Sequence, residues 1–282
     1  SRDSMMKRAC VIGWPIEHSR SPIIHGYWLR TLGIEGSYTR VPVKPEELAG
    51  FLTSMKERGL SGCNVTVPHK EAALALAQER DEAAIAIGAA NTLWLDGGRL
   101  CASNSDAYGY MTYLGLKAPT WAKRDAPVLI LGAGGADRAI VYGFLAAGVT
   151  RVRVSNRSTA RSEDLVRHFG SRVEACAWDA RSEAARDVAV IVNTTTLGMK
   201  GHGDPDIDFS GVHPDTVVSD IVYVPLETSF LAAARRHGLA TVDGLGMLLH
   251  QAVPGFEKWF GVRPVVTDDL YHLVRADIER PS

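Results

Sequence analysis

The stretch LGAGGADRA, Leu131–Ala139, decides how the second half of this 282-residue chain folds. It follows the continuously apolar run VLIL and opens a helix-like segment, which is the context that a dinucleotide-binding fingerprint requires. Gly132 permits a tight turn, while Gly134 and Gly135 let the backbone approach a pyrophosphate held at the helix start. Asp137 stands where the strict fingerprint has its third glycine. A glycine-rich turn without a ligand is the alternative interpretation.

The next expected strand indicates which nucleotide would bind. In NAD-binding proteins a carboxylate near the end of this strand, about 20 residues after the glycines, holds the ribose 2′-hydroxyl. Here the corresponding residues read SNRSTAR, in which Asn156 is neutral and Arg157, Ser158 and Arg161 surround it. Guanidinium groups bind a 2′-phosphate in bidentate fashion, whereas a carboxylate would repel it. We therefore infer NADP as the cofactor, with two solvated arginines after a strand as the alternative.

Strand-like and helix-like segments alternate almost throughout the chain, which predicts α/β architecture with largely parallel sheets. The runs VLIL and VAVIV are continuously apolar, as in strands covered on both faces. In the first half, KEAALALAQERDEAAIAIG (70–88) reads as helix, and NTLWL and RLCAS flank a turn at Asp96–Gly98, which predicts a β-hairpin. A polar linker at Trp121–Pro127 precedes the second half. Pro254 predicts a kink in a late helix.

The bulk composition excludes several classes of protein. The chain is 46% hydrophobic and 22% charged, as in ordinary globular proteins. A net charge of −1 favours neither a nucleic-acid partner nor an anionic membrane. No apolar run is long enough to span a bilayer, and we expect no signal peptide. The four cysteines are scattered without a C-x-x-C pair, so we expect no metal, no disulfide framework and a cytoplasmic location.

The stretch GCNVTVPHK, Gly62–Lys70, is the most unusual segment of the first half. Its beginning alternates apolar and polar residues, as a half-buried strand does, and Pro68 then ends the hydrogen-bond ladder. Asn, Thr, His and Lys are thus gathered at one strand-to-helix junction. Taken alone, the stretch could equally be a solvated strand edge followed by a turn.

Four polar clusters of the first half are GWPIEHSRSPIIHG, GCNVTVPHK, GAANT and SNSDAYG. Together with GAGGADRA, SNRS, NTTTLGM and DGLGMLLHQA they resemble the shikimate dehydrogenase family, in the same order from about Gly13 to Gly261. The resemblance implies two α/β domains with a cleft between them: an N-terminal substrate domain and a Rossmann-type NADP-binding domain. Because the last helices return to the first domain, we expect the substrate domain to span 1–106 plus 244–282 and the nucleotide domain 107–243.

The resemblance also implies an activity, the reversible NADP-linked oxidation of the ring hydroxyl at carbon 3 of shikimate to 3-dehydroshikimate. It puts Lys70 and Asp106 at the reacting centre and Ser19 and Ser21 on the substrate carboxylate. The other implied substrate contacts are Asn64, Thr66, Asn91 and Gln251 on the ring hydroxyls and Tyr223 near the carboxylate. The expected cofactor contacts are Gly132, Ala133, Gly134, Gly135, Ala136, Asn156, Arg157, Ser158, Arg161 and Thr194, with Gly244 and Met247 beside the nicotinamide.

Oxidation of an alcohol by hydride transfer needs a group within hydrogen-bond reach that takes the hydroxyl proton. A neighbouring carboxylate would favour the ammonium form of Lys70 and burial would favour its neutral form, so base and electrostatic anchor both stay open. Structural alternatives exist for other positions. Ser19 and Ser21 could cap a helix beginning at Pro22, and capping by Ser21 is compatible with carboxylate binding by Ser19. Asp106 could cap the helix that follows it. Met247 could be a core residue.

Three histidines of the first half lack metal-ligand spacing, and we interpret them as structural or rim residues. They are His18, His25 and His69.

The fourth cluster departs from the family pattern. The family commonly has Asn-Thr-Asp-Gly there, whereas Ala107 and Tyr108 follow Asp106 in this chain, and Gly26 replaces a common Asn. These changes leave room for another ring acid, such as quinate or an amino-substituted shikimate, as the main substrate. A non-catalytic sensor of shikimate-like ligands would be expected to lose Lys70 or Asp106, or to carry a DNA-binding extension. Monomer and homodimer both stay open.

Overall fold

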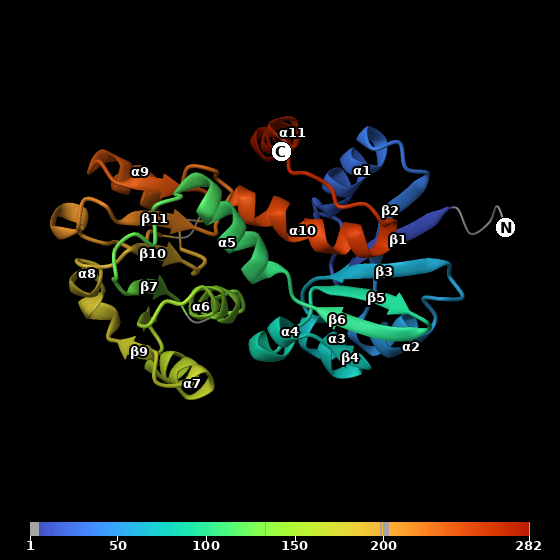
Figure 1. The fold of residues 1–282 in the computed structure, drawn as a ribbon, viewed down its shortest axis with the longest axis horizontal. Helices are drawn as coiled ribbons and strands as arrows, with labels where there is room; N and C mark the ends of the chain where they lie inside the picture. Colours follow the sequence, from blue (N-terminus) through green and yellow to red (C-terminus); the bar gives the residue numbers. More distant parts are fainter. Residues whose placement is uncertain (1–5, 133, 198, 200–202, 282) are drawn as a thin grey trace. The chain divides into compact units, whose positions relative to one another are not determined.

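The computed structural model describes residues 6–132, 134–197, 199 and 203–281, which form two compact units. Unit 1 consists of the described residues up to Ser105 together with Gln251–Val274. Unit 2 consists of the described residues of Asp106–His250 and those from Arg275 onward. Both units are of the α/β class, as predicted (Figure 1). The domain limits inferred from the family resemblance remain a prediction.

Unit 1 is built on a six-stranded sheet of order β2-β1-β3-β5-β6-β4. Strands β1, β2 and β3 run parallel, whereas β5 is antiparallel to β3 and to β6. The predicted hairpin is confirmed as β5 and β6, and its turn places Gly97 and Gly98 at φ values of 56° and 82°, which favour glycine. The strands are β1 Lys7–Gly13, β2 Gly36–Pro42, β3 Leu60–Val65, β4 Glu79–Arg80, β5 Thr92–Asp96 and β6 Arg99–Ser103.

Helices cover both faces of this sheet. Cys10, Cys63 and Leu93 belong to an apolar cluster under α2 and α3, and aromatic side chains of α1 and α10 pack around Tyr38 of β2. Trp259 of α10 donates its indole N–H to Leu93 O over 2.9 Å. The helices are α1 Ser21–Thr31, η2 Pro45–Glu47, α2 Leu48–Thr53, α3 Lys70–Leu76 and α4 Glu82–Ile87, followed late in the chain by α10 Leu245–Phe260 and α11 Asp268–Glu279.

The prediction of continuous helix over 70–88 is wrong. Helix α3 ends at Leu76, and β4 then pairs with β6 before α4 begins. The N–H of Gln78 donates to Leu100 O, and Asp81 caps α4 by accepting from the N–H of Ala84 over 2.8 Å. The sheet edge offers hydrogen-bond partners to this segment, and that tertiary pairing overrides the helix propensity of its alanines.

Unit 2 is built on a six-stranded sheet of order β12-β11-β10-β7-β8-β9, in which all pairs are parallel. This is the doubly wound order of a Rossmann fold, with β7 as its first strand. Both VLIL and VIVN are fully buried, in agreement with strands covered on two faces. The strands are β7 Val128–Leu131, β8 Val152–Ser155, β9 Val173–Cys176, β10 Val190–Asn193, β11 Val217–Asp220 and β12 Ala240–Val242.

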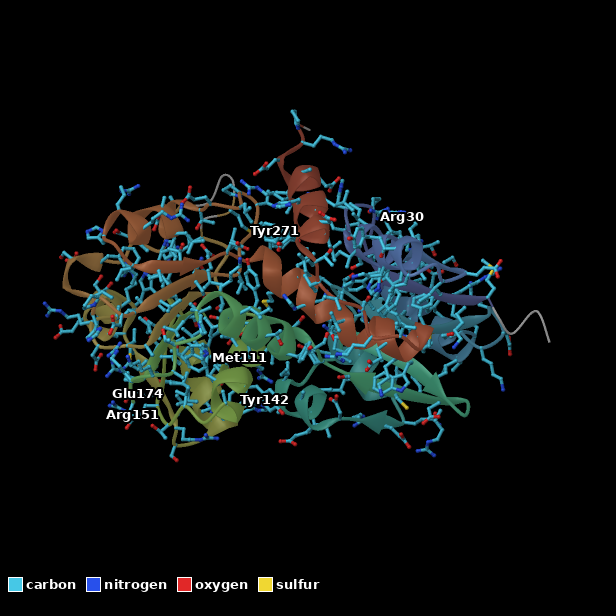
Figure 2. The ribbon with its side chains drawn as sticks, turned by 45° about the horizontal axis from the view of Figure 1, so that its top comes forward. Arg30, Met111, Tyr142, Arg151, Glu174 and Tyr271 are labelled. Carbon is cyan, nitrogen blue, oxygen red and sulfur yellow. The ribbon has the colours of Figure 1, made fainter. Side chains whose placement is uncertain are left out.

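Alternate residues of these strands point to two apolar cores. Val128 and Ile130 pack with α5, α6 and α7, whereas Leu129 and Leu131 pack with α8 and α9. Helices α5 and α6 approach closely at Gly143, where an added Cβ would lie 2.9 Å from Met111; Figure 2 labels Met111 on α5 and Tyr142 on α6. The helices are α5 Asp106–Lys117, α6 Asp137–Ala146, α7 Thr159–Phe169, η3 Trp178–Ala180, α8 Arg181–Ala184, η4 Phe209–Gly211 and α9 Ser229–Arg236.

Helix α10 contains Pro254 in its interior and continues through it to Phe260. Pro254 therefore does not end the helix, and the kink expected there stays a prediction. Within the described residues, no helix combines the length and apolarity needed to cross a membrane.

Candidate active site

The predicted substrate residues of unit 1 lie at one edge of its sheet. Val11 of β1 pairs with Asn64 of β3, and Asn64 pairs with Thr92, the first residue of β5. Thr92 in turn lies opposite Ser103, the last residue of β6. The segments that follow β1, β3 and β6 and the segment that precedes β5 therefore meet at the same edge, where polar side chains can converge.

Asn64 is held from two sides inside unit 1. Its side chain is 5% exposed. The hydroxyl of Tyr38 donates to Asn64 Oδ1 over 2.5 Å, and Asn64 Nδ2 donates to Asn91 O over 3.2 Å. The orientation of this amide is thus set by the protein before any ligand arrives.

Asn91 is the centre of a second polar cluster. Its Nδ2 donates to Ser105 Oγ over 3.0 Å and to Gln251 Oε1 over 3.4 Å, while its Oδ1 accepts from the N–H of Ser105 and the hydroxyl of Thr92. Residues that are 160 positions apart in the sequence, Asn91 and Gln251, are therefore brought together. Because both N–H groups of Asn91 have partners, a ligand that accepts from this amide would replace the longer contact, to Gln251.

Thr66 and Lys70 follow β3 at the junction that the sequence singled out. The Thr66 hydroxyl donates to Ile12 O over 2.7 Å, which leaves its oxygen able to accept. A Cβ on Gly13 would lie 2.0 Å from Thr66 Oγ1, so only glycine fits beside it. Lys70 is the first residue of α3 and is half-buried. The preceding His69 is buried with its Nε2 2.6 Å from Val43 O, in accordance with a structural histidine.

Of the two serines that could cap a helix starting at Pro22, Ser21 does not cap it. Helix α1 begins at Ser21 itself, and the N–H of Ser21 donates to Ser19 Oγ over 3.3 Å. The earlier serine therefore satisfies the helix start, because its hydroxyl lies two residues before the first helical N–H. Arg40 donates to Ser19 O, which fixes this loop against β2. An adjacent hollow of about 760 Å³ is lined by Trp14, Pro15, Ile16, Glu17, Arg40 and Pro42.

In unit 2 the glycine-rich loop follows β7 at the carboxyl edge of the parallel sheet. Gly132 has a φ of 115°, and a Cβ on it would lie 2.6 Å from Thr194 Oγ1. Thr194 is buried and donates from both its N–H and its hydroxyl to Leu131 O, each over 2.8 Å. The two predicted cofactor residues Gly132 and Thr194 are therefore in contact. Ala133 lies outside the described residues.

The rest of the loop leads into α6. Gly134 and Gly135 are exposed, and Ala136 precedes the first helical residue, Asp137. The helix start thus lies where the fingerprint predicts phosphates, and the first N–H groups of a helix have no intrahelical partner. Asp137 is 1% exposed, and neither carboxylate oxygen has a hydrogen-bond partner. Burial raises the pKa of Asp137 to about 6.

The loop after β8 carries the residues predicted to recognise a 2′-phosphate. Ser158 caps α7 by accepting from the N–H of Arg161, and Asn156 Nδ2 donates to Ser158 O over 3.2 Å. The side chains of Arg157 and Arg161 are exposed. The guanidinium of Arg157 lies 5.6 Å from the centre of the Trp178 ring, a cation–π distance. This arrangement leaves two cations at the surface beside the helix start.

The remaining predicted residues of unit 2 lie after β11, after β12 and at the start of α5. Tyr223 is half-buried, and Gly244 has no room for a side chain because a Cβ would lie 2.5 Å from Ile221 O. Met247 packs against the core around α5 and α6, in agreement with the alternative that it is a core residue. Asp106 is the first residue of α5 and is half-buried. Lys70 belongs to unit 1 and Asp106 to unit 2.

Several residues that organise these edges were not singled out from the sequence. Tyr38 and Ser105 hold the two asparagines, and Trp178 contacts Arg157. Ser105 belongs to the quoted cluster SNSDAYG, so a motif contained it, whereas Tyr38 and Trp178 lie in segments with no local signal. In the part of the chain that the structure describes, no three His, Cys, Asp or Glu side chains are grouped to hold a metal ion.

The two α/β units, one of them doubly wound with a glycine-rich loop at its carboxyl edge, are typical of a nucleotide-dependent oxidoreductase. Three family models match the chain: the shikimate dehydrogenase substrate binding domain over residues 11–93, shikimate / quinate 5-dehydrogenase over 117–198, and the shikimate 5′-dehydrogenase C-terminal domain over 244–266. The chain belongs to the shikimate dehydrogenase family, whose members are oxidoreductases.

Named relatives and solved structures agree with this assignment. A curated shikimate dehydrogenase (NADP(+)) from Brucella canis is 55% identical over 277 residues, which cover 97% of this chain and 96% of the relative. The structure of shikimate 5-dehydrogenase from Thermus thermophilus in complex with NADP(H) and shikimate is 35% identical, with a TM-score of 0.82, and covers 96% of this chain and 99% of that chain. The structure of quinate dehydrogenase from Corynebacterium glutamicum in complex with NAD is 29% identical, with a TM-score of 0.87. The match covers 95% of this chain and 98% of that chain.

Proposed function

We propose that this protein is an NADP-dependent shikimate dehydrogenase, which interconverts shikimate and 3-dehydroshikimate in aromatic amino-acid biosynthesis. One observation carries the proposal: the 55% identity to an NADP-dependent shikimate dehydrogenase extends over nearly the full length of both chains. At that identity the two chains share both the substrate and the nucleotide regions rather than a single domain. The geometry of each unit supports the same function.

The nucleotide residues of unit 2 fit NADP. The tight turn at Gly132 and the start of α6 offer N–H groups to a pyrophosphate. Exposed Arg157 and Arg161 supply positive charge for a 2′-phosphate, and the neutral Asn156 stands where an NAD enzyme has a carboxylate. We assign the other expected contacts as follows: Gly134, Gly135, Ala136, Ser158 and Thr194 to the phosphates and ribose, and Gly244 and Met247 to the nicotinamide. Bound NADP supplies the hydride acceptor.

The polar edge of unit 1 holds the substrate. We assign Asn64, Thr66, Asn91 and Gln251 to the ring hydroxyls, and Ser19 and Ser21, with Tyr223, to the carboxylate. The buried amides of Asn64 and Asn91 are already oriented by their neighbours, so they lose little freedom when a small polyol binds. Pre-organised donors of this kind favour one pattern of ring hydroxyls over others.

Lys70 and Asp106 act at the reacting hydroxyl. A general base there takes the proton of the hydroxyl as hydride leaves the carbon that bears this hydroxyl. A fixed positive charge there stabilises the developing alkoxide. Lys70 can perform either task, and an arginine substitution separates them because it keeps the charge and removes the accessible base. That experiment is described in the Discussion.

A quinate/shikimate or aminoshikimate dehydrogenase is the second candidate. Ala107 and Tyr108 follow Asp106 where the family commonly has glycine, and Tyr108 is 39% exposed. The TM-score of 0.87 to quinate dehydrogenase is also as high as those to shikimate dehydrogenases. These observations concern the choice of ring acid and leave the reaction type unchanged.

A paired steady-state assay tests both candidates, with shikimate and quinate each offered with NADP and with NAD. We expect kcat/KM to be highest for shikimate with NADP. Higher kcat/KM for quinate would replace the first candidate with the second. Turnover of neither acid, with NADP binding intact, would reject both substrates and leave the nucleotide assignment standing.

We further propose that the protein acts in the cytoplasm as a monomer or homodimer, without nucleic-acid or membrane partners. The net charge of −1 offers no electrostatic footprint for a polyanion, and the four cysteines are free thiols in the structure.

A further inference from the structure

Tyr38 of β2 contacts Asn64, one of the residues assigned to the substrate. Its side chain is 8% exposed, and its hydroxyl donates to Asn64 Oδ1 over 2.5 Å. Burial raises the pKa of Tyr38 well above its usual range, so the phenol keeps its proton and can donate it. The phenol therefore holds Asn64, a residue assigned to the ring hydroxyls.

The backbone carbonyl of Asn91 decides which way the Asn64 amide faces. Asn64 Nδ2 lies 3.2 Å from Asn91 O, and a carbonyl oxygen can only accept. The amide oxygen of Asn64 must then face Tyr38, so that the phenol is the donor. One N–H of Asn64 remains for a ligand, so a ring hydroxyl at this position can accept a hydrogen bond from it. Without the phenol, the amide oxygen would lose the partner that holds it in place.

The ring of Tyr38 is itself held by an uncharged aromatic stack. The imidazole of His25 lies 4.1 Å from it at an interplanar angle of 16°, and Trp28, Phe256 and Trp259 surround that imidazole. His25 is fully buried, and both of its ring nitrogens are without a hydrogen-bond partner. Burial lowers the pKa of His25 to about 3, so it stays neutral in the physiological range. The stack therefore fixes the phenol by packing, independently of pH.

We propose that Tyr38 is a positioning residue for substrate binding, which presents the Asn64 amide in the orientation that a hydroxylated ring acid requires. Tyr38 acts through this side chain and not by direct contact with the reacting atoms. The inference rests on the proposed function, because it takes the substrate site to lie at this edge of unit 1. It adds a second residue to the substrate site, since the phenol fixes the direction in which the Asn64 amide points.

Tyr38→Phe tests the proposal because it removes the hydroxyl and keeps the ring that stacks on His25. We expect the KM for shikimate to rise about ten-fold, as for loss of one hydrogen bond that orients a buried group, with a smaller change in kcat. The KM for NADP should stay within about two-fold of the wild type. An unchanged KM for shikimate in a folded variant would overturn the positioning role.

Tyr110→Phe is the matched control. Tyr110 is also buried, and its hydroxyl lies 2.6 Å from Ser219 Oγ in unit 2. The variant therefore loses the same group from a similar buried environment, but in unit 2. Equal increases in the shikimate KM for both variants would mean that Tyr38 supports the fold in general and would overturn the proposal.

A double-mutant cycle with Asn64→Ala shows whether the effect passes through the amide. If it does, Tyr38→Phe should raise the shikimate KM much less in the Asn64→Ala background than in the wild type. Fully additive effects would contradict the mechanism. If Tyr38→Phe does not fold, His25→Leu, which removes the stacking ring, should raise the shikimate KM about three-fold, and no increase would overturn the proposal.

The wild type separates this inference from the proposed function. If the wild-type protein does not turn over shikimate, the proposed function fails before any variant is compared. If it turns over shikimate and Tyr38→Phe behaves as the wild type, only the positioning role of Tyr38 fails.

Discussion

The two sheets carry their candidate binding residues in different ways. In unit 1, Asn64 and Asn91 are buried and their amides hydrogen-bond to the protein on both sides. In unit 2, the side chains of Arg157 and Arg161 are exposed, and the described contacts of their loop are mainly a helix cap and one aromatic ring. One site is assembled in advance, whereas the other offers charge at the surface.

The difference follows from the chemistry of the proposed ligands. A neutral ring hydroxyl is recognised only through short, directional hydrogen bonds, so the amides that contact it have to be fixed beforehand. A phosphate carries charge that acts over several ångströms, and arginine side chains can reach it from an exposed loop. Substitutions in unit 1 should therefore act on turnover and shikimate affinity, and those in unit 2 on nucleotide choice.

Lys70→Ala should produce the largest effect and would show whether catalysis depends on the prearranged edge of unit 1. We expect turnover to fall by roughly 10²–10⁴, because the variant loses the group that takes the hydroxyl proton or stabilises the developing alkoxide. The KM for NADP should change little. Steady-state kinetics against Lys56→Ala, an exposed lysine of the same unit, measure the effect. Near-normal turnover would remove Lys70 from the mechanism.

Lys70→Arg then separates the two roles of this lysine. If Lys70 is an electrostatic anchor, the arginine variant keeps the charge and should recover much of the activity lost in Lys70→Ala. If Lys70 is the base, the arginine variant should be about as slow as the alanine variant at neutral pH, since a guanidinium does not release its proton there.

Arg157→Ala should produce the next largest effect and would test the surface-charge character of unit 2. Loss of a charged hydrogen bond to a 2′-phosphate should raise the KM for NADP about 10- to 100-fold, with little change for NAD. The salt dependence of NADP binding should also weaken. Arg151→Ala is the control, because Arg151 is an exposed arginine before β8, labelled in Figure 2. An equal loss for NADP and NAD would refute the 2′-phosphate assignment.

Asp137→Asn should have the smallest effect, and this effect is on the free energy of unfolding. Asp137 is buried, unlike the exposed arginines of unit 2. The pKa of Asp137 is about 6 in the folded protein, above the ordinary aspartate value of 3.8, so folding favours the protonated form. Its contribution to the free energy of unfolding is complete below about pH 4 and is lost as the pH rises through about 6. The asparagine side chain does not ionise, so the variant does not lose stability in this way as the pH rises.

We therefore expect the stability of Asp137→Asn relative to the wild type to increase between pH 4 and pH 7. The gain is at most about 3 kcal/mol, since one pKa unit is worth about 1.4 kcal/mol. Denaturant unfolding at several pH values measures it. Asp220→Asn is the comparison, because burial likewise raises the pKa of Asp220 to about 6, but Asn193, Val222 and Thr228 donate to its carboxylate. A difference that does not vary with pH would show that Asp137 is ionised when buried.

Several features could be predicted because they are written in neighbouring residues. Local periodicity and turn chemistry indicate three of them: the glycine loop after VLIL, the parallel sheet of the second half, and the hairpin around Gly97 and Gly98. The family assignment also came from short ordered motifs and is confirmed by the family models and the curated relatives. The inference of NADP agrees with the cofactor named for those relatives.

The sequence by itself determined the α/β class, the glycine turn at Gly132 and the grouping of polar residues at strand ends. Only the tertiary structure decided that 70–88 is interrupted by β4, that Ser19 rather than Ser21 supports the start of α1, and that Asp137 is buried without partners. It also decided the pairs Tyr38–Asn64 and Asn91–Gln251, which are 26 and 160 residues apart. The reason is physical: periodicity reports which face of an element is apolar, whereas a side-chain hydrogen bond depends on which distant elements the sheet order makes neighbours.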